Sequence, residues 1–104
     1  MALIIKEFDQ YVLSYYTEIS EPIVATIHCF LGTSYHGSIT FLKAGESVSD
    51  SLSSNTIKLE YHEEHFSRVL DIIRNERPLY LRYFEEYQRG WLITSKEEVG
   101  EEES

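Results

Sequence analysis

The sequence predicts an α+β domain: an antiparallel sheet of about six strands with one helix packed on a face, in the order of about four strands, helix and hairpin. Most segments alternate apolar and polar residues with a period of two, and one segment changes to helical spacing. All strand connections but one are too short for a helical crossover, which favours antiparallel pairing. With 104 residues and 42% hydrophobic residues, the chain suffices for one core.

The part of the chain before the helix is expected to hold about four strands. Alternation appears at residues 11–15 but is interrupted over residues 6–10, so this stretch forms one bent strand or two short ones. Residues 23–31 are apolar on one face and partly apolar on the other, which is typical of a central strand. Residues 38–43 follow as its neighbour, after a glycine-bounded hairpin loop over residues 32–37.

A long polar loop is expected over residues 44–56, where five Ser accompany Gly, Asp and Asn. We expect this loop to be mobile, since a loop of this length without secondary structure is usually functional or disordered. Val48 and Leu52 lie four residues apart, so a short helical turn is the alternative. Alternation resumes over residues 57–61 and predicts a strand that is solvated on one face.

The period changes once, in the sequence EEHFSRVLDIIRNE. Its apolar residues fall at i, i+3, i+4 and i+7 and form a helical stripe of Phe66, Val69, Leu70 and Ile73. Pro78 prevents the helix from continuing. Residues 79–83 then alternate, residues 85–90 form a turn, and residues 91–94 return as the second strand of a hairpin.

The C-terminal third reads VLDIIRNERPLYLRYFEEYQRGWLITSKEEVGEEE. It resembles a recurring ending of small uncharacterised bacterial proteins, in which a helix finishing in Leu-Arg-Asn-Glu-Pro is followed by a hairpin and a Thr-Ser-x-Glu-x-Val-Gly-Glu tail. This chain departs from that pattern at Glu98, where a proline is expected before Val99. The resemblance implies no activity. It implies that the tail belongs to the folded unit, whereas composition predicts a domain of residues 1–96 followed by an acidic tail of residues 97–104.

Charge and composition limit the classes of partner that the chain is expected to bind. The formal net charge is −9, but five Glu lie in residues 97–104, which leaves 13 acids against 9 bases elsewhere, a net −4. An acidic chain with two bases before Lys58 is expected to bind no nucleic acid. The longest apolar run, residues 23–31, is far shorter than the ~20 residues of a membrane helix. Without a targeting segment and with a single cysteine, the chain is expected to be cytoplasmic and to bind no membrane.

The residues predict no catalytic group, metal site or cofactor, and favour a protein that is not an enzyme. His62 and His65, in YHEEHF, come nearest to a metal motif, but one closes a strand and the other opens the helix. The further candidates, which are His28, Cys29 and His36, lack a zinc-binding spacing. Cys29 lies on an all-apolar strand face, so we interpret it as a core residue. Acids occur in runs at strand ends and turns, where charge is solvated.

Tyrosine is the most unusual component, with eight residues in the chain. Tyr and Trp are enriched in binding hot spots, although a half-buried rim of Tyr on a sheet is an equally good interpretation. The predicted partner-binding residues are Tyr35, His36, Tyr87 and Trp91. Tyr80 and Arg82 share a strand face and form a candidate pair for binding a carboxylate or phosphate.

Two functions remain open. The first is a non-enzymatic acidic interaction module that self-associates and binds a protein partner, as an inhibitor or adaptor. The second is a small anionic-ligand binder or enzyme with a pocket between sheet and helix. A homo-oligomer is expected because a sheet covered by one helix leaves its other face open. On the predicted strands that open face carries Val24, Phe30, Leu42, Tyr80 and Phe84.

Overall fold

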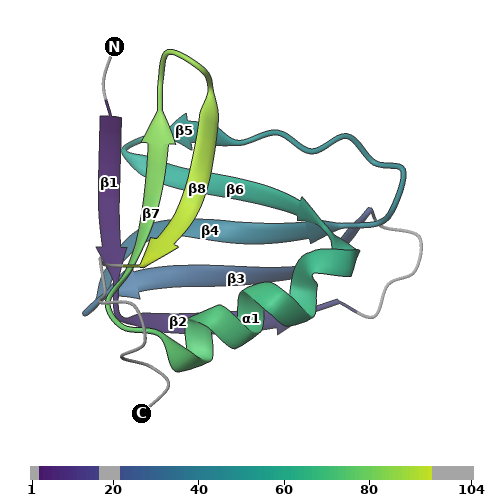
Figure 1. The fold of residues 1–104 in the computed structure, drawn as a ribbon, viewed down its shortest axis with the longest axis horizontal. Helices are drawn as coiled ribbons and strands as arrows, with labels where there is room; N and C mark the ends of the chain where they lie inside the picture. Colours follow the sequence, from purple (N-terminus) through teal and green to yellow (C-terminus); the bar gives the residue numbers. More distant parts are fainter. Residues whose placement is uncertain (1–2, 17–21, 95–104) are drawn as a thin grey trace, which may run out of the picture.

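The structure is a computed structural model that describes residues 3–16 and 22–94 (Figure 1). The acidic tail predicted over residues 97–104 lies outside the described residues. In chain order the described elements are β1 (Leu3–Phe8), β2 (Gln10–Tyr15), β3 (Ile23–Leu31), β4 (Ser34–Leu42), β5 (Ser51–Ser53), β6 (Thr56–His62), the 3-10 turn η1 (Glu63–His65), α1 (Phe66–Asn75), β7 (Leu79–Phe84) and β8 (Arg89–Thr94). The predicted α+β class is confirmed.

The strands form two sheets, so the prediction of a single six-stranded sheet is wrong. The three-stranded sheet has the order β1-β7-β8, and the five-stranded sheet has the order β2-β3-β4-β6-β5. The N-terminal stretch is two short strands, and the chain passes from one sheet to the other at Asp9. The Asp9 N–H donates to the Phe30 carbonyl oxygen (2.9 Å), and the Asp9 carboxylate accepts from the Gly32 N–H (3.0 Å). These bonds hold the corner against the β3–β4 turn.

One strand pair is parallel, which the prediction of an antiparallel sheet missed. β4 and β6 run in the same direction, with Gly37 opposite Ile57 and Leu42 opposite His62. The connection between them is long enough to return the chain to its starting end without a helix. The segment read as a polar loop contains β5, which pairs antiparallel with β6. Both the loop without secondary structure and its helical alternative are therefore wrong at residues 51–53, whereas the expected mobility stays a prediction.

The core lies between two layers. In Figure 1 the three-stranded sheet and α1 lie side by side over one face of the five-stranded sheet, with β1, β7 and β8 crossing its strands steeply. α1 buries Val69 and Ile73 there, with Phe66 and Leu70 packed alongside, which confirms the predicted helical stripe. The Phe66 ring meets Phe41 edge to face, with ring centroids 5.1 Å apart.

The single open apolar face expected from the sequence does not exist. Tyr80 and Phe84 belong to β7 in the three-stranded sheet, whereas Val24, Phe30 and Leu42 belong to the five-stranded sheet. Leu42 is buried, and Val24 packs against the core. The error follows from placing all strands in one sheet, because the corner at Asp9 turns the two sheets' outer faces in different directions.

Candidate binding surface

The outer face of the three-stranded sheet combines a cation with aromatic and aliphatic side chains. Along β7 the odd-numbered side chains are buried in the core and the even-numbered ones are half-buried on the outer side, as strand alternation requires. The register places Ile5 of β1 and Trp91 of β8 directly beside Arg82. We call this surface the Arg82 face, and its main residues are Leu3, Ile5, Tyr80, Arg82, Phe84 and Trp91.

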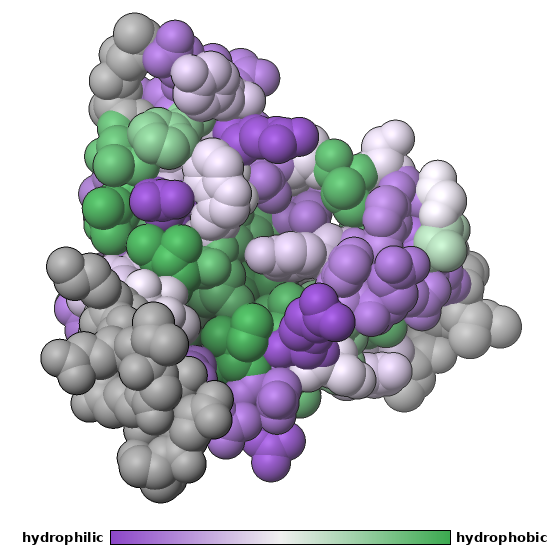
Figure 2. Space-filling view, viewed as in Figure 1, coloured by the Kyte–Doolittle hydropathy of each residue, from purple (hydrophilic) through white to green (hydrophobic). Residues whose placement is uncertain are grey.

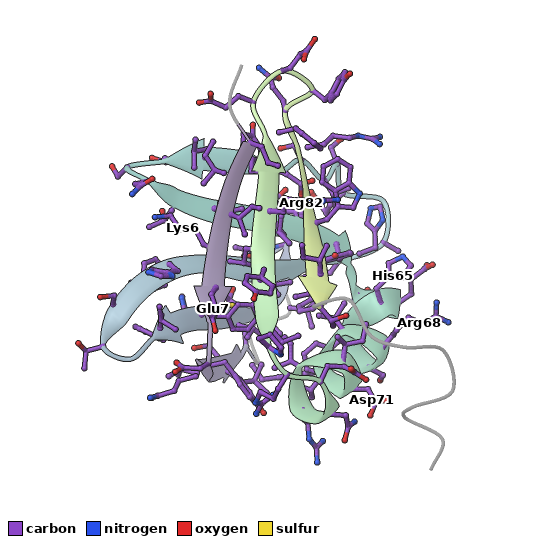
Figure 3. All side chains as sticks on the ribbon, turned by 60° about the vertical axis from the view of Figure 1, so that its left-hand side comes forward. Lys6, Glu7, His65, Arg68, Asp71 and Arg82 are labelled. Atoms are coloured by element: carbon purple, nitrogen blue, oxygen red, sulfur yellow. The ribbon has the colours of Figure 1, made fainter. Side chains whose placement is uncertain are left out.

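Arg82 sits at the centre of the face between two rings. Its guanidinium carbon lies 5.2 Å from the Trp91 ring centroid and 5.7 Å from that of Phe84. The two rings meet edge to face with centroids 5.4 Å apart. A cation held over aromatic rings gains about 0.5–1 kcal/mol at exposed sites and more when it is desolvated. The two rings therefore favour this position of the guanidinium group. Arg82 is labelled in Figure 3.

No polar group of the described residues pairs with Arg82. Its Nε is buried without a hydrogen-bond partner, the sole such side-chain atom in the described part of the chain. Glu7 is the nearest acid in the strand register of this face, opposite Tyr80, and it forms no ion pair with Arg82. Burying a polar group without a partner costs free energy, and none of the described acids offsets this cost by pairing with Arg82.

A shallow hollow lies at the hairpin end of the Arg82 face. Phe84, Tyr87, Arg89 and Trp91 line it, and its volume is about 420 Å³. Tyr87 is 64% exposed, and its ring contacts Phe84 with centroids 6.0 Å apart. Towards the other edge of the sheet, Leu3 and Ile5 are 45% and 50% exposed. Figure 2 shows apolar side chains gathered over β1 and β7 at the left of the view.

The structure brings together four of the six predicted binding residues. Tyr80, Arg82 and Trp91 lie on the Arg82 face, and Tyr87 lies beside it in the turn after β7. Tyr35 and His36 lie near the start of β4 in the other sheet and do not join them. The hollow near Arg82 also lies on the outer side of its sheet, whereas the sequence suggested a pocket between sheet and helix.

Tyr35 and His36 have local structural contacts. The Tyr35 ring packs on Phe30 with centroids 5.4 Å apart, and its hydroxyl lies 3.3 Å from His28 Nδ1. His36 Nδ1 donates to the carbonyl oxygen of Glu7 over 2.7 Å. This bond ties β4 of one sheet to β1 of the other, so we interpret His36 as a link between the sheets.

Sequence reasoning missed the contribution of β1 to the surface. Leu3 and Ile5 precede the stretch from which the N-terminal strands are predicted, so no partner strand is expected for them from the sequence. Their place beside Phe84 and Arg82 follows from the pairing of β1 with β7, which are about seventy residues apart in the chain. Local periodicity carries no information about such long-range pairing. Exposed aliphatic residues on an N-terminal edge strand are nevertheless a signal that merits attention.

Sequence reasoning also missed Asp50, a charged residue with a structural role. Its carboxylate accepts from the Glu60 N–H (3.1 Å) and from the Gly90 N–H (2.9 Å), which joins β6 to β8. Burial of Tyr61 and the negative charge of Asp50 raise the Tyr61 pKa above its usual value, and a hydrogen bond with the Leu92 backbone opposes this shift. Asp50 therefore anchors the segment before β5 to two strands.

The groups considered for chemistry are dispersed. Cys29 is fully buried, and burial raises its pKa from 9.0 to about 12, so the thiol is neutral at physiological pH. His62 Nε2 donates to the Glu46 carbonyl oxygen (2.7 Å), whereas His65 Nε2 lies 3.7 Å from the Glu64 carboxylate. Within residues 3–16 and 22–94, no three or more His, Cys, Asp or Glu residues gather as metal ligands.

Helix length and the comparisons with known proteins bear on the remaining expectations. None of the described helices has both the length and the apolar character that crossing a membrane requires. The resemblance of the C-terminal stretch to bacterial proteins stays a prediction. Comparison with models of protein families, with curated proteins and with solved structures finds no match to this chain.

Proposed function

We propose that the chain is a non-enzymatic interaction module that self-associates and binds a protein partner through the Arg82 face, as an inhibitor or adaptor. The observation that carries this proposal is the state of Arg82. Its guanidinium group is positioned by Phe84 and Trp91 and has no polar partner among the described residues. An arginine so placed is pre-organised to receive a carboxylate.

The charge balance of the chain makes an unpaired arginine informative. The chain has 18 acidic residues against 9 basic ones, so acids to pair with Arg82 are plentiful in the sequence. None of the described acids does so, and the rings next to the guanidinium group are apolar. A carboxylate from a partner would satisfy two donors at once in a bidentate pair. We therefore expect the partner segment to carry Asp or Glu.

The surroundings of Arg82 favour a protein over a small molecule. Hot spots of protein interfaces are enriched in Trp, Tyr and Arg, and neighbouring apolar contacts exclude water from them. Leu3, Ile5 and Tyr87 are exposed around Arg82 in this manner. Small-molecule sites bury about 70–90% of their ligand, whereas the hollow beside Trp91 is open on the surface. An acidic and apolar segment of a protein fits this surface better.

A selection from displayed peptides tests the proposal. We expect the wild-type protein to enrich peptides in which Asp or Glu stands beside apolar or aromatic residues. Arg82→Ala should weaken binding of the selected peptides by at least about tenfold, since truncating a hot-spot arginine costs ~2 kcal/mol or more. Arg82→Lys should recover only part of the affinity, because lysine lacks the planar fork. Arg68→Ala, on the exposed side of α1, is the matched control.

Two results would contradict the proposal. Unchanged peptide binding in Arg82→Ala would show that the peptide does not bind through the Arg82 face. The second result is a thermal-shift screen in which a nucleotide or metabolite stabilises the protein by ~2.7 kcal/mol at a concentration of about 100 times its dissociation constant. If Arg89→Ala removed that stabilisation, the hollow would be a small-ligand site, and the alternative of an anionic-ligand binder would be correct.

A further inference from the structure

Exposed apolar side chains concentrate on the N-terminal strand pair. Ten large hydrophobic side chains are exposed among the described residues, and six of them belong to β1, β2 or the residue after β2. These six are Leu3, Ile5, Val12, Leu13, Tyr15 and Tyr16. Since β1 ends the strand order of one sheet and β2 that of the other, this stretch forms an edge of both sheets. Long apolar edge strands are templates for pairing with another chain.

The backbone of β1 has free hydrogen-bonding groups along its outer edge. The Glu7 carbonyl oxygen accepts from His36 and so points away from β7. Backbone direction alternates along a strand, so the N–H and C=O groups of Leu3 and Ile5 point the same way. The opposite edge strand agrees with this assignment, since Gly90 directs its N–H away from β7 to Asp50. Leu3 and Ile5 make no hydrogen bond on this side with any described residue.

The two edges of the three-stranded sheet differ in how they are protected. On β8 the Asp50 carboxylate caps the Gly90 N–H, and Tyr61 bonds with the Leu92 backbone. On β1 a side chain caps only Glu7, and residues 3–5 carry no charge, proline or bulge. Alongside these residues no described element lies beyond β1 (Figure 1). β1 therefore lacks the devices that usually prevent strand addition.

We infer that β1 pairs antiparallel with β1 of a second copy, about a twofold axis at Ile4. The Glu7 carbonyl oxygen already accepts a hydrogen bond from His36, so the hydrogen-bond ladder between the two copies ends at Ile5. With the twofold axis at Ile4, residues 3–5 of one copy pair with residues 3–5 of the other in the opposite direction. Leu3 of one copy then lies opposite Ile5 of the other. The four aliphatic side chains then pack together on one face of a six-stranded sheet. This inference rests on the self-association proposed above and identifies its interface.

Two copies of the chain could associate through β1, through the Arg82 face or through β2, and β1 meets the fewest obstacles. Two chains of net charge −9 repel each other, so they associate best where both are uncharged, as residues 3–5 are. Packing two Arg82 faces against each other would instead bring Arg82 of one copy towards Arg82 of the other. Pairing at β2 meets a different obstacle, because the C-terminal end of α1 reaches past β2 in Figure 1. A twofold axis there would bring the two helices together.

Light scattering coupled to gel filtration, over a range of protein concentrations, tests the interface. We expect the wild-type chain to form dimers and Ile5→Lys to weaken their formation by at least about tenfold, because the substitution sets like charges at the paired edge. Ile5 is 50% exposed and Val12 is 55% exposed, so Val12→Lys on β2 is the matched control and should dimerise as the wild type does. Circular dichroism checks that both variants fold.

Failure of the interface and failure of self-association give different results. A wild-type chain that stays monomeric at the highest concentration overturns both. A dimer that persists in Ile5→Lys, or that Val12→Lys weakens equally, overturns the β1 interface and leaves self-association in place. The role of Arg82 in peptide binding is measured separately with Arg82→Ala, so neither result decides it.

Disulfide crosslinking tests the register. Directly opposite, hydrogen-bonded residues have Cα atoms about 5.5 Å apart, within the range that a disulfide spans, whereas diagonal neighbours are about 7–8 Å apart. A mixture of Leu3→Cys and Ile5→Cys chains should therefore crosslink under mild oxidation, and either variant alone should not. Cys29 is buried with a pKa of about 12, so it does not compete. Equal crosslinking of either variant alone would overturn the register.

Discussion

Asp50 and Arg82 are charged residues on either side of β8, and their surroundings are opposite. The Asp50 carboxylate accepts from two backbone N–H groups, those of Glu60 and Gly90. The Arg82 guanidinium lies between aromatic rings, and its buried Nε has no partner. One charge is satisfied within the fold, and the other is positioned but left unsatisfied. The difference separates a charge that stabilises the fold from a charge available to a partner.

Gly90 links the two regions, and of the substitutions that probe this comparison, a change at Gly90 should have the largest effect on stability. A Cβ added there would fall against Leu59 Cδ2 and the Arg82 carbonyl oxygen. Gly90→Ala should destabilise the protein by about 2–3 kcal/mol, because β8 must shift away from both neighbours. Urea denaturation measures the loss. The neighbouring Arg89→Ala is the control and should change stability by less than about 0.5 kcal/mol.

Removing the satisfied charge should come next. Asp50→Ala leaves the N–H groups of Glu60 and Gly90 without their acceptor, and we expect a loss of about 2 kcal/mol in the free energy of unfolding. Glu86→Ala, in the exposed turn before β8, provides the comparison and should be nearly neutral. If the two variants unfolded at the same urea concentration, Asp50 would not be a structural anchor.

The ionisation of Tyr61 reports the charge of Asp50. Burial and Asp50 raise the Tyr61 pKa above 10.0. In the unfolded chain the phenol ionises first as the pH rises, so its contribution to stability is full below pH 10 and is lost as the pH rises towards the folded-state pKa. Ultraviolet absorbance titration, with Tyr61→Phe subtracted, should show this pKa falling in Asp50→Asn. An unchanged pKa would mean that the Asp50 charge does not act on Tyr61.

Removing the unsatisfied charge should have the smallest effect on stability. In Arg82→Ala the lost cation–π contact is offset by removal of the unpartnered Nε, so the free energy of unfolding should change by less than about 1 kcal/mol. Thermal and urea unfolding measure this change. Peptide binding should nevertheless be strongly weakened in the same variant. Loss of stability as large as that of Asp50→Ala would make Arg82 a structural residue and end the contrast.

Local patterns predicted the elements that depend on local packing. The stripe from Phe66 to Ile73 predicts α1, because helix formation and burial of one face are both encoded by spacing. Alternation at Leu79, Leu81 and Tyr83 predicts β7, and the same alternation places Arg82 on the outer side. Two of the six predicted binding residues, Tyr80 and Arg82, therefore lie at the candidate site for a reason that is visible in the sequence.

Pairing between distant segments was not predictable in this way. The Ser-rich composition of residues 44–56 is typical of a loop, and β5 exists because its backbone finds a partner in β6. Asp50 resembles any solvated acid until Glu60 and Gly90 are brought to it from ten and forty residues away. Tyr35 and His36 were grouped with Trp91 by residue type, although their strand belongs to the other sheet.

The sequence by itself determined the α+β class, the helix and the alternation that sends each strand residue inward or outward, because these depend on residues within one turn or two positions. The tertiary structure decided that the chain turns a corner at Asp9 and divides its strands between two sheets. It also decided that β1 lies beside β7 and leaves Leu3 and Ile5 at an open edge. Those outcomes depend on hydrogen bonds and packing between segments that are far apart in the chain. The spacing of residues within one segment does not encode such long-range contacts.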